Sequence, residues 1–221
     1  MEDPSTLLLR ELVRQAIFIG VKATVVPGEL RRTPPVKLQE IPVAATERQL
    51  SSQGVTELYR VRLKNGAHLV VSAGSVVNFG GGKDWKPRSI AIVNAANSSG
   101  LGGGAVDGAI MRAGGSQLVA DRQALPTLPD TNDRISIGDA VMTGPGIYGR
   151  LHAAYVIHAV GPDYNNLKGM TLEYGDELLK NAYRASMREA AAVSIEYVGF
   201  SLLSAGIFRG RQSLEHVLKI G

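Results

Sequence analysis

One stretch, residues 90–115, limits the fold most, because it combines a strand, a glycine loop and the start of a helix. Residues 90–93 are continuously apolar, which is typical of a parallel strand buried on both faces. Glycines at positions 100 and 102–104 follow, and they permit backbone conformations that a side chain would forbid. A helix is expected directly after them, and backbone N–H groups at a helix N-terminus bind anions. The sequence therefore predicts an anion-binding site in this stretch.

A second stretch near the C-terminus repeats this plan. Residues 195–203 have the composition of another buried strand, and they lead into the loop 204–210 and a helix from Gln212. Between the two stretches, residues 173–193 carry apolar side chains along one helical face. Two strand–loop–helix units predict an α/β layered fold with ligand loops at the carboxyl ends of the strands. We therefore expect the ligand site between the two loops.

A hairpin is expected before the first of these stretches. Apolar and polar residues mix over 58–63, Asn65-Gly66 follows, and residues 68–72 resume an apolar pattern. This order predicts two antiparallel strands joined by a type I′ turn. The glycine run that ends in Lys83 lacks the first glycine and the Ser or Thr of a phosphate-binding P-loop, so we do not interpret it as one.

A second hairpin is expected from strands over 135–143 and 151–160. The letters between them, GPGIYG at 144–149, match the dinucleotide-binding fingerprint. That fingerprint requires a helix after the glycines to receive the pyrophosphate, whereas a strand is expected here. A hairpin turn is therefore the expected role of these glycines.

The 221 residues suffice for one domain with an extension. We expect residues 1–54 to form an N-terminal extension, and residues 55–221 to form the folded domain. Asp3-Pro4 predicts the start of a short helix in the extension, and the prolines within 26–45 predict an irregular connector.

Composition excludes several classes of site and partner. With no cysteine, the chain has no disulfide, no thiolate zinc site and no cysteine nucleophile. No apolar run approaches the roughly 20 residues that span a bilayer, and residues 1–4 carry acid where a secretory signal carries base. We expect an intracellular protein, cytoplasmic or nuclear, without a membrane partner. A net charge of +4 and 5% aromatic residues do not favour a nucleic-acid partner.

Four short motifs, taken together, resemble the macrodomain family. Residues 94–97 (NAAN), 102–110 (GGGAVDGAI) and 204–208 (SAGIF) look like the two binding loops of that family, and 156–162 (VIHAVGP) like the strand between them. The resemblance extends from Leu69 to the C-terminus. It implies a three-layer α/β/α sandwich with a mixed, mostly parallel sheet. The spacing is most similar to the MacroD-type branch, whose members hydrolyse ADP-ribose from acidic side chains and deacetylate O-acetyl-ADP-ribose.

The resemblance also implies roles for individual residues, without a metal or a cofactor. Asn97 would contact the distal ribose, Asp107 would orient a ribose hydroxyl or a water, and Phe208 would cover that ribose. Asn97 and Asp107 are the expected catalytic residues, and the water would attack the anomeric carbon. The expected ligand-binding residues line the adenine side or the two diphosphate loops: Ser75, Val76, Asn94, Ala95, Gly102, Gly103, Gly104, Ala105, Val106, Ser204, Ala205, Gly206, Ile207 and Phe208.

Three departures from the family pattern affect these expectations. The usual Gly-Asp-Ile-Thr, whose aspartate receives the adenine amino group, reads GSVV at 74–77. Ser75 could accept a hydrogen bond but is shorter and uncharged, so either the affinity for adenine falls or another residue such as Asp84 supplies the carboxylate. Met111 stands where MacroD-type proteins often carry histidine. After the final helix the family normally adds a strand and a helix, so either the chain is truncated or the N-terminal extension completes its sheet.

Three functions remain open on the sequence: an ADP-ribosyl hydrolase, a binding-only reader of ADP-ribose, and a weak RNA-binding module. The expected partners are ADP-ribose, ADP-ribosylated proteins and O-acetyl-ADP-ribose, bound by a monomer. His158 lies in an apolar strand and is interpreted as a core histidine. Trp85 and Tyr164 either stack on adenine or are half-buried loop aromatics. Arg209 either meets the diphosphate or faces solvent.

Overall fold

A computed structural model describes residues 16–22, 55–63, 65–80 and 85–221. Within these residues one sheet of seven strands has the order β2-β3-β1-β7-β4-β6-β5. The strands are β1 (Ala16–Lys22), β2 (Thr56–Arg62), β3 (His68–Ala73), β4 (Ile90–Ala95), β5 (Ala140–Thr143), β6 (Tyr155–Ala159) and β7 (Tyr197–Ser201). The helices are α2 (Ala105–Gln123), α3 (Leu172–Ala192) and α4 (Leu214–Ile220), with single turns η1 (Val76–Asn78), η2 (Pro87–Ser89) and η3 (Ile207–Arg209).

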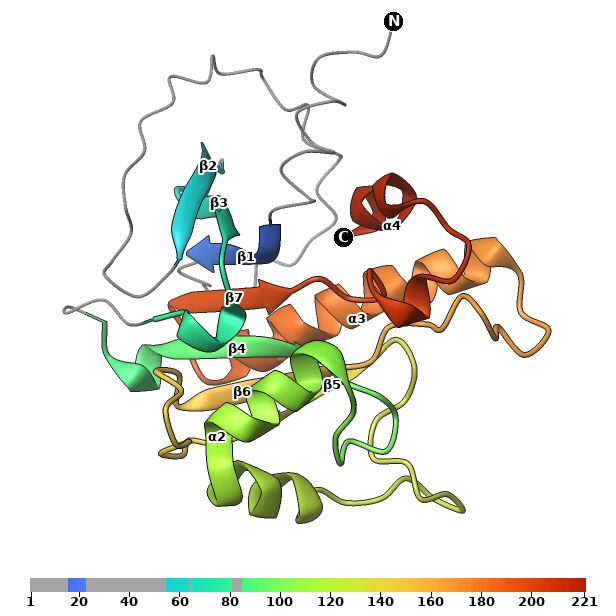
Figure 1. Ribbon diagram of the computed structural model, residues 1–221, viewed down its shortest axis with the longest axis horizontal. Helices are drawn as coiled ribbons and strands as arrows, with labels where there is room; N and C mark the ends of the chain where they lie inside the picture. Colours follow the sequence, from blue (N-terminus) through green and yellow to red (C-terminus); the bar gives the residue numbers. More distant parts are fainter. Residues whose placement is uncertain (1–15, 23–54, 64, 81–84) are drawn as a thin grey trace, which may run out of the picture.

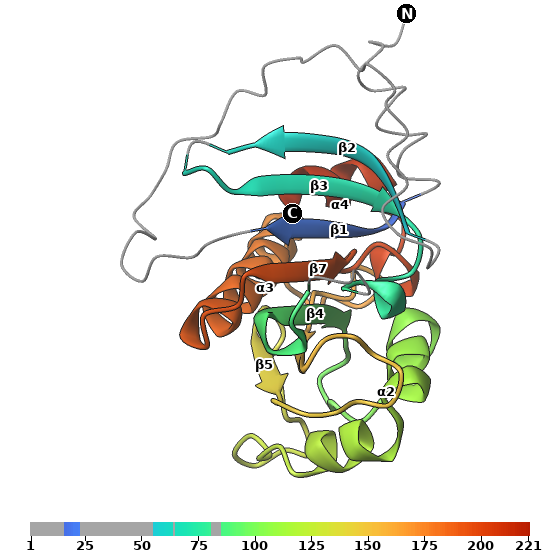
Figure 2. The same cartoon turned by 90° about the vertical axis from the view of Figure 1, so that its left-hand side faces the viewer.

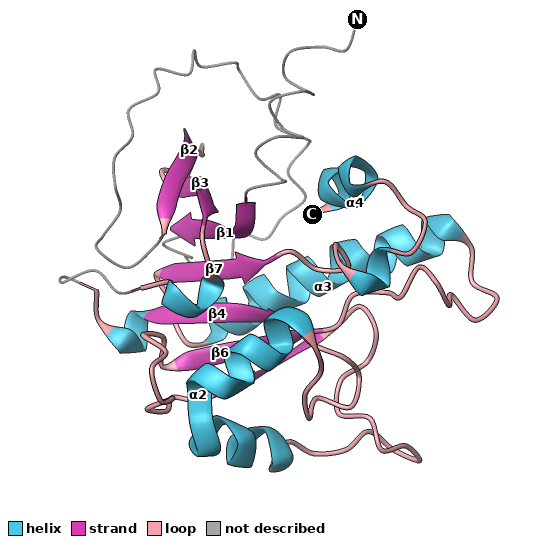
Figure 3. Ribbon diagram, in the orientation of Figure 1, coloured by secondary structure: helices cyan, strands magenta, loops and turns pink. Residues whose placement is uncertain are grey.

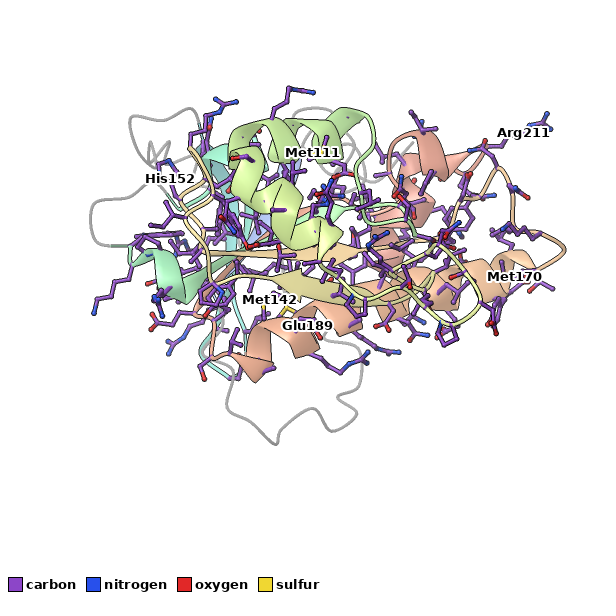
Figure 4. The ribbon with its side chains drawn as sticks, turned by 90° about the horizontal axis from the view of Figure 1, so that it is seen from below. Met111, Met142, His152, Met170, Glu189 and Arg211 are labelled. Atoms are coloured by element: carbon purple, nitrogen blue, oxygen red, sulfur yellow. The ribbon has the colours of Figure 1, made fainter. Side chains whose placement is uncertain are left out.

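The sheet lies between two helical layers, with α2 on one face and α3 on the other (Figures 1 and 2). Figure 4, seen from below, places Met111 of α2 above the sheet and Glu189 of α3 beneath it. Strand β4 is buried on both faces, because Ile92 packs in the core under α2 and Val93 in the core against α3. The three-layer α/β/α sandwich with a mixed sheet is confirmed.

Parallel pairing is confined to three neighbouring strands of the described sheet, β7, β4 and β6. The other four strand pairs are antiparallel, so the sheet is mixed. Parallel strands need long crossover connections, and α2 and α3 lie in those connections (Figure 3).

Both predicted hairpins are confirmed, with differences in detail. In the β2–β3 hairpin the N–H of Gly66 donates to the carbonyl of Leu63 at 2.9 Å, so Gly66 (φ 83°) ends the turn instead of standing at its third position. The predicted type I′ turn centred on Asn65-Gly66 is therefore wrong. In the second hairpin β5 begins at Ala140 instead of residue 135. The N–H of Ile135 donates a hydrogen bond to the Ser98 carbonyl, which lies outside the sheet.

Strand β1 comes from the residues that were expected to form an extension. It pairs antiparallel with β3 on one side and with β7 on the other, so it joins the hairpin to the parallel strands. A sheet completed by N-terminal residues was one of the two alternatives from the sequence, and β1 agrees with it. The predicted helix at Asp3 and the proline-rich connector over 26–45 lie outside the described residues, and the domain boundary at residue 55 stays a prediction.

Helix α2 is sharply kinked at Gly115, whose φ of 68° and ψ of −163° are not helical. The kink frees the carbonyl of Ala113, which accepts the N–H of Arg150 at 2.9 Å. Two helical segments therefore meet at an angle, as Figure 1 shows. Because of this bend, side chains from the two ends of α2 can reach each other, although 15 residues of straight helix span about 22 Å.

Gly149→Ala is expected to lower the free energy of unfolding by about 2–3 kcal/mol. Gly149 has a φ of 50°, and a Cβ there would lie 2.3 Å from the Ala113 carbonyl oxygen at the kink. Urea unfolding would measure the loss. Gly169→Ala is the matched control, since its φ is 83° but a Cβ there would meet no atom within 4 Å. Equal losses in both variants would show that the contact with Ala113 contributes nothing.

Candidate functional site

The two predicted loops lie at one edge of the sheet, because they follow the parallel neighbours β4 and β7. Regular pairing of these strands ends at Val93 and Phe200. Beyond that point the hydroxyl of Ser201 bridges them, donating to the Val93 carbonyl at 2.7 Å and accepting the Ala95 N–H at 3.0 Å. The strands therefore separate where the loops begin, which is where open α/β sheets bind ligands.

Ser75 and Val76 leave the sheet at the same edge. The register pairs Ser72 with Phe18 and Phe18 with Ser201, so β3 ends level with β7. Ser75 caps η1, and its hydroxyl accepts the Val77 N–H at 3.4 Å. Val76 is fully buried. Asp84, the other residue considered for adenine, lies outside the described residues.

Each of the two loops holds a non-glycine residue with positive φ. Ala105 has a φ of 49° where the first loop enters α2, and Ser204 has a φ of 50° in the second loop. Such sparsely populated backbone conformations cost about 1–3 kcal/mol each and cluster at ligand-binding sites. The backbone geometry thus indicates ligand binding at the same two loops that the sequence predicts.

Asp107 is buried, with 3% of its surface exposed, and it forms an ion pair that the sequence analysis missed. Nη1 of Arg122 donates to Oδ1 of Asp107 at 2.6 Å, and Nη2 donates to Oδ2 at 3.3 Å. Nε of Arg122 donates to the Gly100 carbonyl at 2.5 Å. The pair links the two ends of the kinked α2, and the two adjacent glycines at 114–115 were the only signal for it in the sequence.

Asn94 contacts Asp107 from the side of the sheet, and His158 contacts Asn94. Nδ2 of Asn94 donates to Oδ1 of Asp107 at 2.8 Å and lies 3.2 Å from Nδ1 of His158. Nε2 of His158 lies 3.0 Å from Oγ1 of Thr143. Both Asn94 and His158 are fully buried, and the Oδ1 atom of Asn94 has no hydrogen-bond partner among the described residues. His158 is therefore a core histidine, as predicted, but it also supports the candidate site.

Burial and the neighbouring Arg122 guanidinium lower the pKa of His158 from 6.5 to about 3. The histidine is thus neutral in the folded protein near neutral pH. Because Nδ2 of Asn94 can only donate, Nδ1 of His158 is the acceptor of this hydrogen bond. Two acceptors, Nδ1 of His158 and Oδ1 of Asp107, therefore orient the amide of Asn94. The reversed amide would place its oxygen against both of them.

Stability is expected to fall below about pH 6 because of His158. In the unfolded chain this histidine binds a proton below its usual pKa near 6.5, whereas in the folded chain it does so only near pH 3. Between these values the unfolded state holds the extra proton, so His158 lowers stability by up to about 1.4 kcal/mol per pH unit of acidification. Urea unfolding of wild type and His158→Gln across this window tests the prediction. Parallel pH profiles for the two proteins would contradict it.

Asn97 lies beside Asp107, at Gly103. A Cβ on Gly103 would lie 3.2 Å from Oδ2 of Asp107 and 3.7 Å from Nδ2 of Asn97. Nδ2 of Asn97 donates to the Gly102 carbonyl at 3.0 Å, and its Oδ1 accepts the Ser99 hydroxyl at 2.7 Å. The structure therefore brings the two expected catalytic residues together, and it shows that Asn97 also shapes its own loop.

Met111 covers the first loop from α2. A Cβ on Gly102 would lie 3.0 Å from the sulfur of Met111, so the thioether packs directly on this glycine. The side chain at this position is thus next to the predicted diphosphate loop, and an apolar thioether stands where a histidine was noted in MacroD-type proteins.

The second loop is held by the segment that follows β6. The hydroxyl of Ser204 donates to the Pro162 carbonyl at 2.8 Å, and the N–H of Tyr164 donates to the Phe208 carbonyl at 2.8 Å. Asn165 donates to the Ile207 carbonyl at 2.7 Å. Ala205 is partly buried against the core, Gly206 is exposed, and 80% of the Ile207 surface is exposed.

Two aromatic residues that could have stacked on adenine are engaged elsewhere. Tyr164 is buried and donates its hydroxyl to Asp176 at 2.8 Å, and burial together with this carboxylate raises the pKa of the tyrosine. Trp85 stacks on Tyr197 with 4.3 Å between ring centroids. Both are loop aromatics packed on the fold. Arg209 is half-buried, and its Nε has no hydrogen-bond partner among the described residues.

A cleft of about 660 Å³ lies away from these loops, between the end of α2 and the residues after β5. It is lined by Asp121, Thr143 and Ile147, among others, and by none of the predicted site residues. This cleft is therefore separate from the candidate site. In the described part of the chain no group of three or more His, Asp or Glu side chains is placed to hold a metal ion, and no helix is long and apolar enough to cross a membrane.

The α/β/α fold and the two loops indicate a class of protein, and comparison with known families identifies that class. Residues 93–217, more than half of the chain, match the model of the Macro domain. This protein belongs to the Macro domain family.

Among curated relatives, "Macro domain-containing protein in gbd 3'region" of Cupriavidus necator is 48% identical over 118 residues, 53% of this chain and 62% of its own length. "O-acetyl-ADP-ribose deacetylase 1" of Pantoea vagans is 46% identical over 123 residues, 56% of this chain and 66% of its own length. The matches thus span less than two thirds of these relatives. A solved Oceanobacillus iheyensis macrodomain with ADP shares the fold, with a TM-score of 0.57 at 24% identity, over 75% of this chain and 77% of that one.

Proposed function

We propose that this protein is a hydrolase that removes ADP-ribose from mono-ADP-ribosylated acidic side chains and deacetylates O-acetyl-ADP-ribose. The observation that carries the proposal is the meeting of Asp107 and Asn97 at Gly103, within the first loop. The deacetylase name of the Pantoea vagans relative supports the same class of reaction.

Binding would come from backbone N–H groups of the loops 102–106 and 204–208, which surround the diphosphate without lysine or metal. Ser75 is the proposed partner of adenine. Because its hydroxyl already accepts the Val77 N–H and carries no charge, we expect a weaker adenine contact than an aspartate would give.

Chemistry would proceed by attack of a water on the anomeric carbon of the distal ribose. The water oxygen forms a bond to that carbon, the bond from the carbon to the ester oxygen breaks, and the acidic side chain leaves as a carboxylate. One water proton stays on the new hydroxyl and the other passes to solvent. Oδ2 of Asp107 would accept a hydrogen bond from the water or from a ribose hydroxyl, so the protein contributes mainly orientation.

A binding-only reader is the second candidate, and one observation favours it. Both oxygens of Asp107 accept hydrogen bonds from Arg122, which leaves less of the carboxylate free to orient a water or a ribose hydroxyl. The same two loops would then bind ADP-ribose without turnover.

Two measurements on the full chain separate these functions. A gel assay follows the release of ADP-ribose from a glutamate-modified protein, and calorimetry measures the binding of free ADP-ribose. The hydrolase requires both binding and release. Binding without release would replace it with the reader, and absence of binding would refute both.

A further inference from the structure

Arg122 is one of the largest fully buried side chains of the protein, with 1% of its surface exposed. All three of its donor nitrogens point at the first loop and the helix that follows it: Nε to the Gly100 carbonyl, and Nη1 and Nη2 to the two oxygens of Asp107. A planar guanidinium that makes three such contacts fixes both acceptors relative to each other. Arg122 thus joins the start of the loop to the carboxylate at its end.

The two carboxylate oxygens of Asp107 have different hydrogen-bond partners. Oδ1 receives short hydrogen bonds from Arg122 at 2.6 Å and from Asn94 at 2.8 Å. Among the described residues, Oδ2 receives only the 3.3 Å contact from Arg122. It is also the atom that a Cβ on Gly103 would approach. Oδ1 is therefore occupied by the protein, and Oδ2 is the oxygen presented to the loop and to Asn97.

We infer that Arg122 is a positioning residue of the site, acting through Asp107 and through the carbonyl of Gly100. It selects the carboxylate orientation that presents Oδ2, and it fixes the first residue of the glycine loop whose N–H groups face the ligand. The kink at Gly115 exists in the same element and makes the contact possible, since it turns the second half of α2 back toward the first. The part of this inference that concerns turnover rests on the proposed hydrolase function.

Arg122→Gln and Arg122→Lys test the inference in the full chain. The glutamine removes the charge and the fork, whereas the lysine keeps a cation and one donor. We expect turnover per ADP-ribose-binding molecule to fall about 10²-fold in Arg122→Gln, with a smaller loss of affinity for ADP-ribose. Arg122→Lys is expected to turn over about tenfold faster than Arg122→Gln. Arg184→Gln, an exposed arginine on α3, is the control and should turn over as wild type does.

A role limited to stability would reduce the binding-competent fraction and leave turnover per binding molecule unchanged, and that result would overturn the inference. If Arg122→Gln does not fold, Arg122→Lys alone carries the comparison, because a lysine cannot reproduce three donors in one plane.

Hydrogen exchange of the unliganded protein gives a readout that does not depend on the proposed function. Peptides covering residues 98–106 are expected to exchange about tenfold faster in both Arg122 variants, while peptides from β6 and α3 keep their rates. Unchanged exchange over 98–106 would overturn the inference even in an active enzyme. Conversely, a wild-type protein without release activity would refute the hydrolase and leave this result standing.

Discussion

Asp107→Asn is expected to lower turnover by about 10²- to 10⁴-fold while changing the affinity for ADP-ribose much less. The substitution keeps the shape of the side chain but replaces one carboxylate oxygen with an NH₂ group. Arg122 and Asn94 both donate to Oδ1, so the amide should turn its oxygen toward them and its NH₂ toward Gly103. A donor would then replace the acceptor that orients water or the ribose hydroxyl.

The asparagine variant is preferable to alanine because Arg122 is buried. Asp107→Ala would leave a buried guanidinium without its partner, which typically costs about 3–5 kcal/mol of stability, so lost turnover could reflect unfolding. Asp121→Asn, on the same helix but partly exposed and paired with the Tyr148 hydroxyl, is the control. Full turnover in folded Asp107→Asn would show that the carboxylate has no role in the reaction.

Gly103→Val is expected to lower turnover by about 10²-fold or more with little loss of stability. Unlike Gly102, Gly103 does not have a positive φ, so the backbone accepts a side chain. The new Cβ would lie 3.2 Å from Oδ2 of Asp107 and 3.7 Å from Nδ2 of Asn97, and the valine methyl groups would occupy the space between them.

Steady-state kinetics and thermal unfolding together check this prediction. Gly104→Ala provides the comparison, since a Cβ there would meet no protein atom within 4 Å, and it should lose less turnover than Gly103→Val. Equal losses would mean that any side chain on the loop impairs turnover, whether or not it lies near Asp107 and Asn97.

The parts of the fold that local pattern determines could be predicted from the sequence. The continuous apolar run at 90–93 is the doubly buried strand β4, and the glycines after it form a loop that enters α2. The hairpin around Gly66 followed from turn chemistry, although the position of its turn did not. Each of these features depends on residues that are neighbours in the chain.

Features set by distant residues could not be predicted. Strand β1 is in the sheet because β3 and β7, more than 40 and 170 residues away, provide its hydrogen bonds. Arg122 reaches Asp107 only because α2 bends, and helical periodicity alone would place them about 22 Å apart. The sequence therefore indicated where Asp107 stands but not that it is buried and ion-paired.

One measurement tests the proposed function most directly: hydrolysis of a glutamate-linked ADP-ribosyl peptide in ¹⁸O-labelled water, with mass spectrometry of the released peptide. Attack on the anomeric carbon leaves both glutamate oxygens in place, so we predict ADP-ribose release with an unlabelled peptide carboxylate. Release with ¹⁸O in the peptide carboxylate would place the attack on the ester carbonyl. That outcome would contradict the roles proposed for Asp107 and Asn97.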